Sequence, residues 1–268
     1  MNPLVVYFGL AYLISWTIWL PLYGSTIGLS HLPTLPYHHA SGGLGPLLAS
    51  FCTTWIYHKK EGVYQLLRKC IQIKPLLYLI IALCSPFILA LIAAIINYGI
   101  AKTPINLSGL LHSKEFPQFH IHTFFIYNLI FFGFGEEVGW RGFALPRLQK
   151  KWNALTASVF LTVFWAIWHL PLFFYRPGYT SMDMAGMLGW VFSLLTGSVL
   201  LTWLYNSSLE SILICAIFHS TIDIAFTADL ADKNMVNYMG LLITVWGIMI
   251  LIIFKPQNLS NKTRETAI

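Results

Sequence analysis

Apolar runs long enough to cross a lipid bilayer recur along this 268-residue chain, and they constrain its fold more than any other feature. A membrane-spanning helix needs about 20 apolar residues. Hydrophobic residues make up 57% of the chain and charged residues only 10%, whereas soluble domains carry about 25% charged residues. We therefore predict an all-α, polytopic membrane bundle of about eight transmembrane helices. The candidate spans are residues 4–23, 42–57, 76–98, 122–138, 154–174, 185–205, 211–228 and 236–254.

The polar segments between these runs are short, so we expect one integral-membrane domain over residues 1–268. No polar stretch exceeds about 25 residues, which is too short for a separate soluble core. The net charge of +6 comes from basic residues spread over these segments, which indicates membrane orientation and no nucleic-acid partner. With the N-terminus inside, twelve of the 16 Lys and Arg residues fall in inner segments. This asymmetry predicts that both termini are cytoplasmic.

Two connecting segments each allow two interpretations. Residues 59–74 mix basic and apolar side chains, so they could form an amphipathic helix on the inner leaflet or a solvated loop. The outer loop, residues 24–41, contains His31, His38 and His39 together with two prolines. A metal site is one explanation for these histidines, but a polar connector stiffened by proline is the simpler one.

Six ionisable side chains interrupt three of the apolar runs. A charge at bilayer depth costs several kcal/mol, so such residues usually face a cavity and have a function. Their grouping on three spans therefore predicts an active site within the membrane. The residues are Glu136, Glu137, Arg141, His169, His219 and Asp223.

The first group separates into a pair and a single carboxylate. Glu137 and Arg141 are four residues apart and share one helical face, so we expect them to form an ion pair. Glu136 projects about 100° away from that face and is the candidate general base. A three-member ion cluster that locks helices together is the structural alternative. Gly135 and Gly139 would allow close packing of helices or a break in the helix at this point.

The two histidines lie on other spans. Trp165 stands one turn before His169 and can pack against its ring. His219 and Asp223 share a helical face, so Asp223 could orient the imidazole, or both side chains could bind a metal or face a substrate carbonyl. The whole set offers a base, a proton carrier and oxyanion-stabilising donors, as acyl hydrolysis requires. It also offers an oxygen and nitrogen metal site, and spacing alone does not decide between the two.

Counting the rise of a regular helix places Glu136 and His169 at different depths in the membrane. At about 1.5 Å per residue, Glu136 and His169 do not meet in two regular antiparallel spans. They meet if the helix of Glu136 is broken, longer or displaced, or if the next span begins near Thr156. The neighbouring glycines favour a break.

In order, spacing and placement, these motifs resemble those of the CPBP family of intramembrane proteases. That family includes the type II CAAX prenyl endopeptidases and many bacterial immunity-type proteins. The resemblance covers residues 124–226, which we expect to be the catalytic core, and the family's eight-helix core suits the number of spans. The second motif, FxxxH, has Trp165 in place of Phe. The three motifs are Glu136-Glu137-Val138-Gly139-Trp140-Arg141, Trp165 to His169, and His219 to Asp223.

The resemblance implies an intramembrane endopeptidase in a bacterial plasma membrane, acting on a membrane-associated protein or peptide such as a prenylated CAAX-type chain. Glu136, assisted by His169, would activate water without a covalent intermediate. His219 and Asp223 would stabilise the oxyanion, while Glu137 and Arg141 would hold the site together. The third motif departs from the family, because an ionised Asp223 cannot donate a hydrogen bond as Asn does.

Three alternatives follow from the same residues. No cofactor is expected, but a divalent metal such as Zn²⁺, if present, would be held by Glu136, His169 and His219. A non-catalytic immunity protein, for example against a bacteriocin, or a scaffold of the same fold would explain the departures at Trp165 and Asp223. A proton- or ion-coupled transporter is disfavoured, because transporters often carry inverted repeats and the chain shows no internal repeat.

Overall fold

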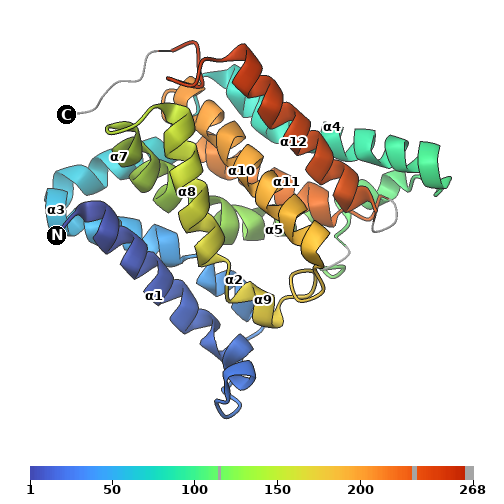
Figure 1. The fold of residues 1–268 in the computed structure, drawn as a ribbon, viewed down its shortest axis with the longest axis horizontal. Helices are drawn as coiled ribbons and strands as arrows, with labels where there is room; N and C mark the ends of the chain where they lie inside the picture. Colours follow the sequence, from blue (N-terminus) through green and yellow to red (C-terminus); the bar gives the residue numbers. More distant parts are fainter. Residues whose placement is uncertain (114–115, 231–233, 263–268) are drawn as a thin grey trace.

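The structure is a computed structural model that describes residues 1–113, 116–230 and 234–262, and helices dominate that range (Figure 1). The predicted all-α membrane bundle is confirmed. The α-helices are α1 (Pro3–Tyr23), α2 (His38–Gly42), α3 (Gly45–Cys70), α4 (Leu76–Ala101), α5 (Ile121–Asn128), α6 (Gly135–Glu137), α7 (Leu145–Gln149), α8 (Ala154–Trp168), α9 (Leu172–Tyr175), α10 (Met184–Ser207), α11 (Ile212–Thr227) and α12 (Met235–Ile253). Two 3₁₀ segments, η1 (Gly24–Ile27) and η2 (Leu107–Leu111), and two π-helical segments, η3 (Leu129–Phe134) and η4 (Val138–Ala144), complete the elements.

Five helical stretches in the described part of the chain are long and apolar enough to cross a membrane. They coincide with the first, third, fifth, sixth and eighth expected spans, and α11 is a shorter apolar helix at the seventh. The expected span at 42–57 lies in α3, which runs on to Cys70. The span at 122–138 is divided among α5, η3 and α6. The crossing stretches are Pro3–Ile27, Leu76–Ala101, Ala154–Tyr175, Met184–Ser207 and Met235–Ile253.

The basic segment that follows the second expected span, residues 59–74, is helical as far as Cys70. Helix α3 continues through it with one interruption at Lys59, whose φ of 53° is left-handed. Leu66 is buried, while Tyr64 and Leu67 are exposed. The cytoplasmic position of both termini stays a prediction. Three of the basic residues on which that prediction depends, Lys114, Lys233 and Arg264, lie outside the described residues.

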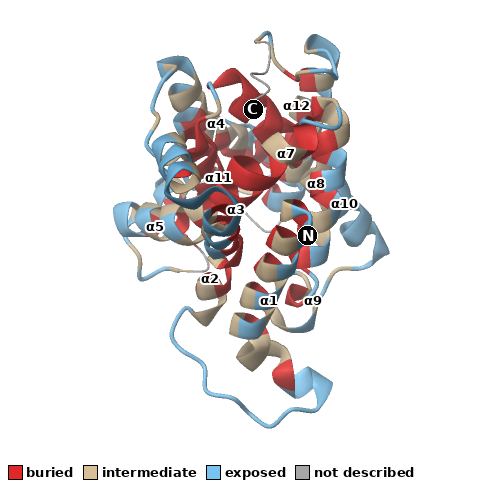
Figure 2. Cartoon of the chain, turned by 90° about the vertical axis from the view of Figure 1, so that its left-hand side faces the viewer, coloured by how far each residue is buried: buried red, intermediate tan, exposed pale blue. Residues whose placement is uncertain are grey.

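Two sets of helices pack around the bundle interior. Helix α1 packs along α3, and α10, α11, α4 and α12 contact one another in sequence (Figure 1). Figure 2 shows that burial is concentrated around α7, α11 and the adjoining part of α8, while the long loop after α1 is exposed. Of the six ionisable side chains singled out above, all but Asp223 are buried.

The helix that carries Glu136 contains wider, π-helical turns. The π-helical segments η3 and η4 flank the three-residue α6, and the residues at their boundaries keep right-handed helical backbone angles. The break that the glycines favoured is not found, because the helix is continuous and has wider turns on either side of α6. A π turn bonds residue i to i+5, which re-aims the side chains that follow, and such turns are frequent at functional sites. The regular rise assumed for residues 122–138 therefore does not apply to the segment that leads to Glu136.

Glycines let neighbouring backbones approach this segment, as the sequence predicted. A Cβ atom on Gly135 would stand 2.7 Å from the carbonyl oxygen of Gly43. A Cβ on Gly139 would stand 2.3 Å from the Tyr7 hydroxyl and 2.6 Å from the carbonyl oxygen of Pro46. These distances are shorter than van der Waals contact, so only glycine fits here without a shift of backbone.

We expect Gly139→Ala to lower the free energy of unfolding by about 1–3 kcal/mol, because the added methyl group overpacks against the Pro46 backbone. Thermal unfolding in detergent measures the effect. Gly197→Ala is the matched control: it adds the same methyl group inside helix α10, where nothing lies within 4 Å. The control should be neutral or stabilising by up to about 1 kcal/mol. Equal midpoints for the two variants would contradict the close packing at Gly139.

Candidate active site

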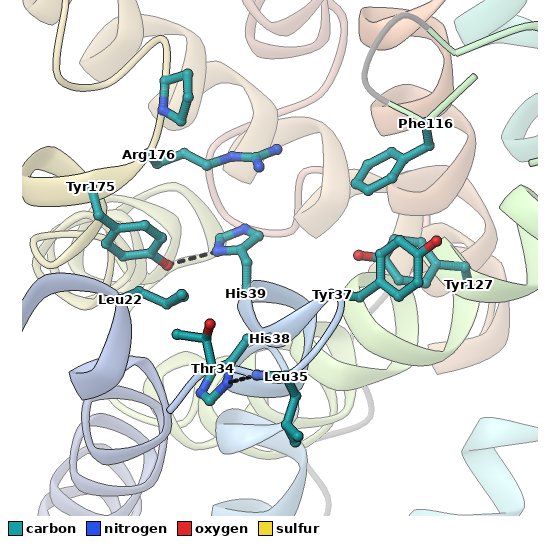
Figure 3. Close-up of a pocket in the computed structure, with 11 residues that line it drawn as sticks. Leu22, Thr34, Leu35, Tyr37, His38, His39, Phe116, Tyr127, Tyr175 and Arg176 are labelled. Carbon is teal, nitrogen blue, oxygen red and sulfur yellow. Dashed lines mark hydrogen bonds between the residues drawn. The ribbon is translucent and has the colours of Figure 1, made fainter. Parts of the chain in front are cut away.

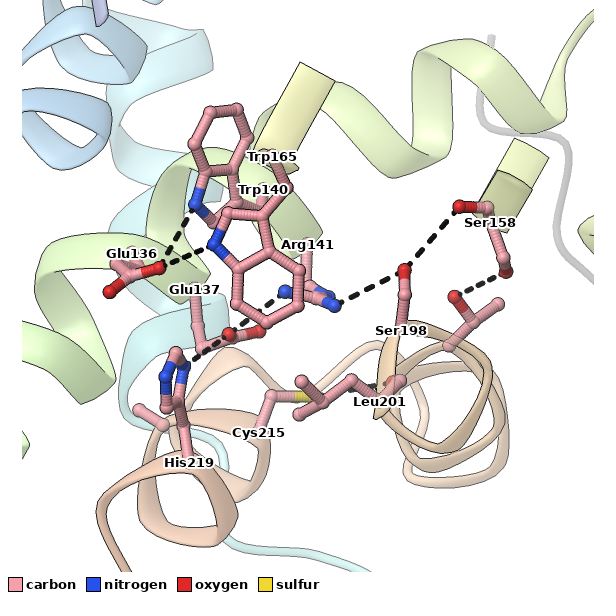
Figure 4. Close-up of polar contacts among 12 residues, drawn as sticks. Glu136, Glu137, Trp140, Arg141, Ser158, Trp165, Ser198, Leu201, Cys215 and His219 are labelled. Carbon is pink, nitrogen blue, oxygen red and sulfur yellow. Dashed lines mark hydrogen bonds and ion pairs between the residues drawn. The ribbon is translucent and has the colours of Figure 1, made fainter. Parts of the chain in front are cut away.

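Glu136 is buried and accepts hydrogen bonds from two indole rings (Figure 4). Its Oε2 atom lies 2.7 Å from Nε1 of Trp165 on α8 and 3.3 Å from Nε1 of Trp140 on η4. Both donors are uncharged, so they orient the carboxylate without neutralising it. Glu136 therefore points away from Glu137 and Arg141, as the helical projection predicted.

Glu137 and Arg141 form the expected ion pair. Nη1 of Arg141 lies 3.0 Å from Oε1 of Glu137, and both side chains are fully buried. The guanidinium also stacks over the Trp165 ring at 4.7 Å and donates to Oγ of Ser198 at 3.4 Å. A buried charge pair with additional polar contacts on both sides holds α6, η4, α8 and α10 in one arrangement.

His219 is hydrogen-bonded to Glu137 and not to Asp223. Its Nδ1 atom lies 2.7 Å from Oε1 of Glu137, whereas its Nε2 atom lies 3.8 Å from Oδ2 of Asp223, beyond hydrogen-bond distance. Because a carboxylate only accepts, Nδ1 of His219 carries a proton and donates it. Glu137, and not Asp223, therefore fixes the tautomer of His219.

His169 follows the last residue of α8 and is held by the preceding turn. Its Nδ1 atom lies 2.7 Å from the carbonyl oxygen of Trp165, so Nδ1 donates and Nε2 of the neutral ring is left as an acceptor. The ring stacks against Tyr179 with centroids 6.2 Å apart, and it meets Trp168 edge-on at 4.9 Å. These contacts fix which nitrogen of His169 can accept a proton.

Trp165 connects the three spans. Besides its hydrogen bond to Glu136, its ring centroid lies 5.8 Å from the rings of both His169 and His219. The predicted packing of Trp165 on His169 is confirmed. The structure thus gathers Glu136, His169 and His219 around one indole, with Asp223 at the edge, and the catalytic roles of all four stay predictions.

We expect Trp165→Phe to lower kcat about 10- to 100-fold, because it removes the shorter of the two hydrogen bonds that orient the Glu136 carboxylate. The variant restores the family's usual aromatic residue, so packing should survive. Cleavage kinetics in proteoliposomes measure the change. Trp16→Phe is the control, since it removes an indole donor from a backbone oxygen, that of Trp168. Full activity in Trp165→Phe would show that the indole hydrogen bond is dispensable.

The residues expected to hold a metal do not fit that role as arranged. Within the part of the chain that the structure describes, no group of three or more His, Cys, Asp or Glu side chains could hold a metal ion. We therefore derive no step through a metal.

A pocket of about 310 Å³ is lined by residues of the loop after α1, of α2 and of the end of α9, among others (Figure 3). His39 lines the pocket, and its Nδ1 atom is hydrogen-bonded to the Tyr175 hydroxyl at 2.7 Å. Its ring also contacts Phe132, which precedes Glu136 by four residues. Burial lowers the pKa of His39 to about 3, so its ring is neutral. Arg176 supplies the cation of a lining that is otherwise largely apolar and aromatic. Glu136, His169, His219 and Asp223 are not among its lining residues.

Sequence reasoning missed three side chains that shape the site. The donor role of Trp165 was overlooked, because only its ring was considered. Trp140 stands four residues after Glu136 and could have been found by the same face rule that paired Glu137 with Arg141. Tyr179 lies in a loop, where no helical periodicity points to it.

Comparisons with known proteins agree with the motifs. Residues 118–225 match the family model described as Rce1-like, type II CAAX prenyl endopeptidase. The chain is 29% identical over 147 residues to a protein named CAAX prenyl protease 2 from Methanococcus maripaludis. That alignment covers 52% of this chain and 54% of the relative, so the match spans about half the length of each. The family resemblance predicted from the sequence is confirmed, and the matched segment overlaps the expected core at 124–226.

Proposed function

We propose that this integral membrane protein, which matches the Rce1-like family over residues 118–225, is an intramembrane endopeptidase. The observation that carries the proposal is the setting of Glu136. It is a buried carboxylate, held by two uncharged indole donors beside two histidines. If Glu136 served only as a structural counter-ion, we would expect it to face Arg141. Arg141 is paired with Glu137 instead.

The side chains can carry out water-mediated hydrolysis. Glu136 accepts a proton from a water molecule as that water attacks the carbonyl carbon of the scissile bond. Nε2 of His169, unprotonated in the neutral ring, accepts the water's second hydrogen and orients it. The carbonyl electron pair moves onto oxygen as the new carbon–oxygen bond forms. Glu136 then gives its proton to the leaving nitrogen as the carbon–nitrogen bond breaks, so the products are an acid and an amine.

The chain of charges behind Glu136 supports the developing negative charge. Arg141 neutralises Glu137, and Glu137 holds His219 by its Nδ1–H. The Nε2 atom of His219 is then directed away from Glu137, and in the doubly protonated ring it donates to the oxyanion. The Asp223 carboxylate, whose Oδ2 lies 3.8 Å from Nε2 of His219, compensates that ring's charge. Glu137 and Arg141 are thus positioning residues.

The substrate that we propose is a membrane-associated protein or peptide, including prenylated CAAX-type chains, the class named in the family description. A lipid-anchored chain reaches a site at bilayer depth from within the membrane. The largely apolar and aromatic pocket lined by His39 has room for a short hydrophobic segment of such a substrate.

The test uses the full chain in proteoliposomes with two synthetic peptides, one farnesylated on a cysteine three residues from its C-terminus and one unmodified. We expect release of a C-terminal fragment from the lipidated peptide, detected by mass spectrometry, and no release with the Glu136→Gln variant. Activity should persist with chelators present. Comparison of wild-type and Glu136→Gln membranes for shortened C-termini then searches for natural substrates.

One observation favours the second candidate, a non-catalytic immunity or scaffold protein. Asp223 does not hydrogen-bond His219 and, when ionised, cannot donate to an oxyanion. If Glu136→Gln preserves protection or partner binding and neither peptide is cleaved, this second function replaces the first.

A further inference from the structure

The candidate site lacks a neutral donor where one is needed. The indole N–H groups of Trp140 and Trp165 are both directed at Glu136, and Nδ1–H of His169 is directed at a backbone oxygen. Asp223 stands where the family motif carries a side chain able to donate. An oxyanion is usually stabilised by preorganised donors, and the loss of one costs about 10²–10³ in kcat. A neutral donor to the oxyanion would therefore have to come from another described residue near Glu136 and Asp223.

Tyr179 occupies a fixed position at the mouth of the site. It ends a tight turn that begins at Arg176, with its backbone N–H 3.1 Å from the Arg176 carbonyl oxygen. Pro177 and Gly178, whose φ is 90°, stand at the two central positions, as a type II turn requires. This turn returns the chain toward α8, so the position of Tyr179 is set by local backbone chemistry.

Aromatic contacts then orient the Tyr179 ring. It stacks on His169 with centroids 6.2 Å apart and an interplanar angle of 12°. Phe173 and Trp190 meet it edge-on at 5.2 and 5.8 Å. A ring contacted from three directions by α8, α9 and α10 cannot swing away without breaking these contacts.

The hydroxyl of Tyr179 is hydrogen-bonded to the Trp190 side chain and lies within electrostatic range of two carboxylates of the site. Because an indole N–H only donates, the phenol oxygen accepts this bond and its own proton stays available to donate. Both Glu136 and Asp223 interact electrostatically with it, although they lie on different helices, α6 and α11. Its ring is nearly parallel to that of His169, with the centroids 6.2 Å apart, so the phenol stands beside the imidazole. Tyr179 is therefore beside His169 and near both the proposed base, Glu136, and Asp223, the position at which the family motif carries a donor.

We propose that Tyr179 is a catalytic residue that donates a hydrogen bond to the carbonyl oxygen of the scissile bond, in place of the amide that Asp223 lacks. This inference rests on the endopeptidase activity proposed above. The phenol keeps its proton throughout. It binds the oxygen as the carbonyl electron pair moves onto it, and it releases the oxygen when the carbonyl re-forms and the carbon–nitrogen bond breaks.

The test compares Tyr179→Phe with wild type on the lipidated peptide. We expect kcat to fall about 10²- to 10³-fold while KM changes less than about twofold, because the lost bond is strongest in the transition state. Tyr12→Phe is the matched control: it also removes a tyrosine hydroxyl, one that donates to the backbone oxygen of Phe164. Its kcat should stay within about twofold of wild type.

Two further measurements separate catalysis from folding. A peptide with a phosphinyl group in place of the scissile carbonyl mimics the tetrahedral intermediate, and Tyr179→Phe should bind it at least about tenfold more weakly, with the affinity for uncleaved peptide unchanged in a Glu136→Gln background. Adding Asp223→Asn to Tyr179→Phe should restore at least about tenfold in kcat, because it supplies an amide donor.

The outcomes are distinct for the two proposals. If Tyr179→Phe keeps kcat within about threefold while Glu136→Gln is inactive, the protease stands and the role of Tyr179 is overturned. The role is also overturned if Tyr179→Phe binds both peptides equally poorly, which a loss of local structure would produce. If wild type cleaves neither peptide, the endopeptidase proposal fails and Tyr179 falls with it.

Discussion

Replacing Glu136 by glutamine is expected to lower kcat by a factor of about 10²–10⁴, the range in which a positioned general base contributes. Glutamine has nearly the same shape and keeps a carbonyl oxygen that can accept from Trp165 and Trp140, so the indole contacts survive. What it loses is the ability to take a proton from water. Initial rates of peptide cleavage in proteoliposomes measure the effect, and binding of the uncleaved peptide should change little.

Glu61→Gln is the matched control for this prediction. It makes the same chemical change on α3 at an exposed carboxylate, which accepts a hydrogen bond from Gln65 one turn away. Its rate should equal that of wild type. A fully active Glu136→Gln enzyme would end the mechanism, because no other carboxylate in the described site combines burial with freedom from an arginine partner.

Contacts between residues about one helical turn apart could be predicted from the sequence. The ion pair of Glu137 and Arg141, the separate direction of Glu136 and the packing of Trp165 on His169 all follow from spacings of one to four residues. The all-α membrane bundle follows from the apolar runs. These features depend only on the helix repeat and on hydrophobicity, which each segment carries by itself.

Contacts between spans could not be predicted in the same way. The bond from His219 to Glu137 joins residues 82 positions apart, and nothing in either segment distinguishes Glu137 from Asp223 as its partner. The sequence placed Asp223 on the correct face, yet 3.8 Å separates it from His219. The decisive factor is the π winding of η3 and η4, which rotates Glu136 and Glu137 by an amount that a regular helix repeat does not contain.

The largest stability effect should come from breaking the buried pair that supports the site. Arg141→Met leaves the Glu137 carboxylate buried with His219 as its remaining hydrogen-bond partner, and removal of one member of such a pair costs about 3–5 kcal/mol. Chemical unfolding in detergent measures the loss. Lys69→Met is the control: it breaks the partly exposed pair with Glu210 and should cost under about 1 kcal/mol.

The double variant Glu137→Gln/Arg141→Met separates charge from packing. It leaves no unpaired ion in the core, so it should be more stable than Arg141→Met alone, although it removes more of the native polar contacts. Its activity should still be low, because His219 loses the carboxylate that holds its Nδ1–H. If the double variant is less stable than Arg141→Met, charge compensation is not what the ion pair contributes to stability. Its contribution would then come from packing with Trp165 and Ser198.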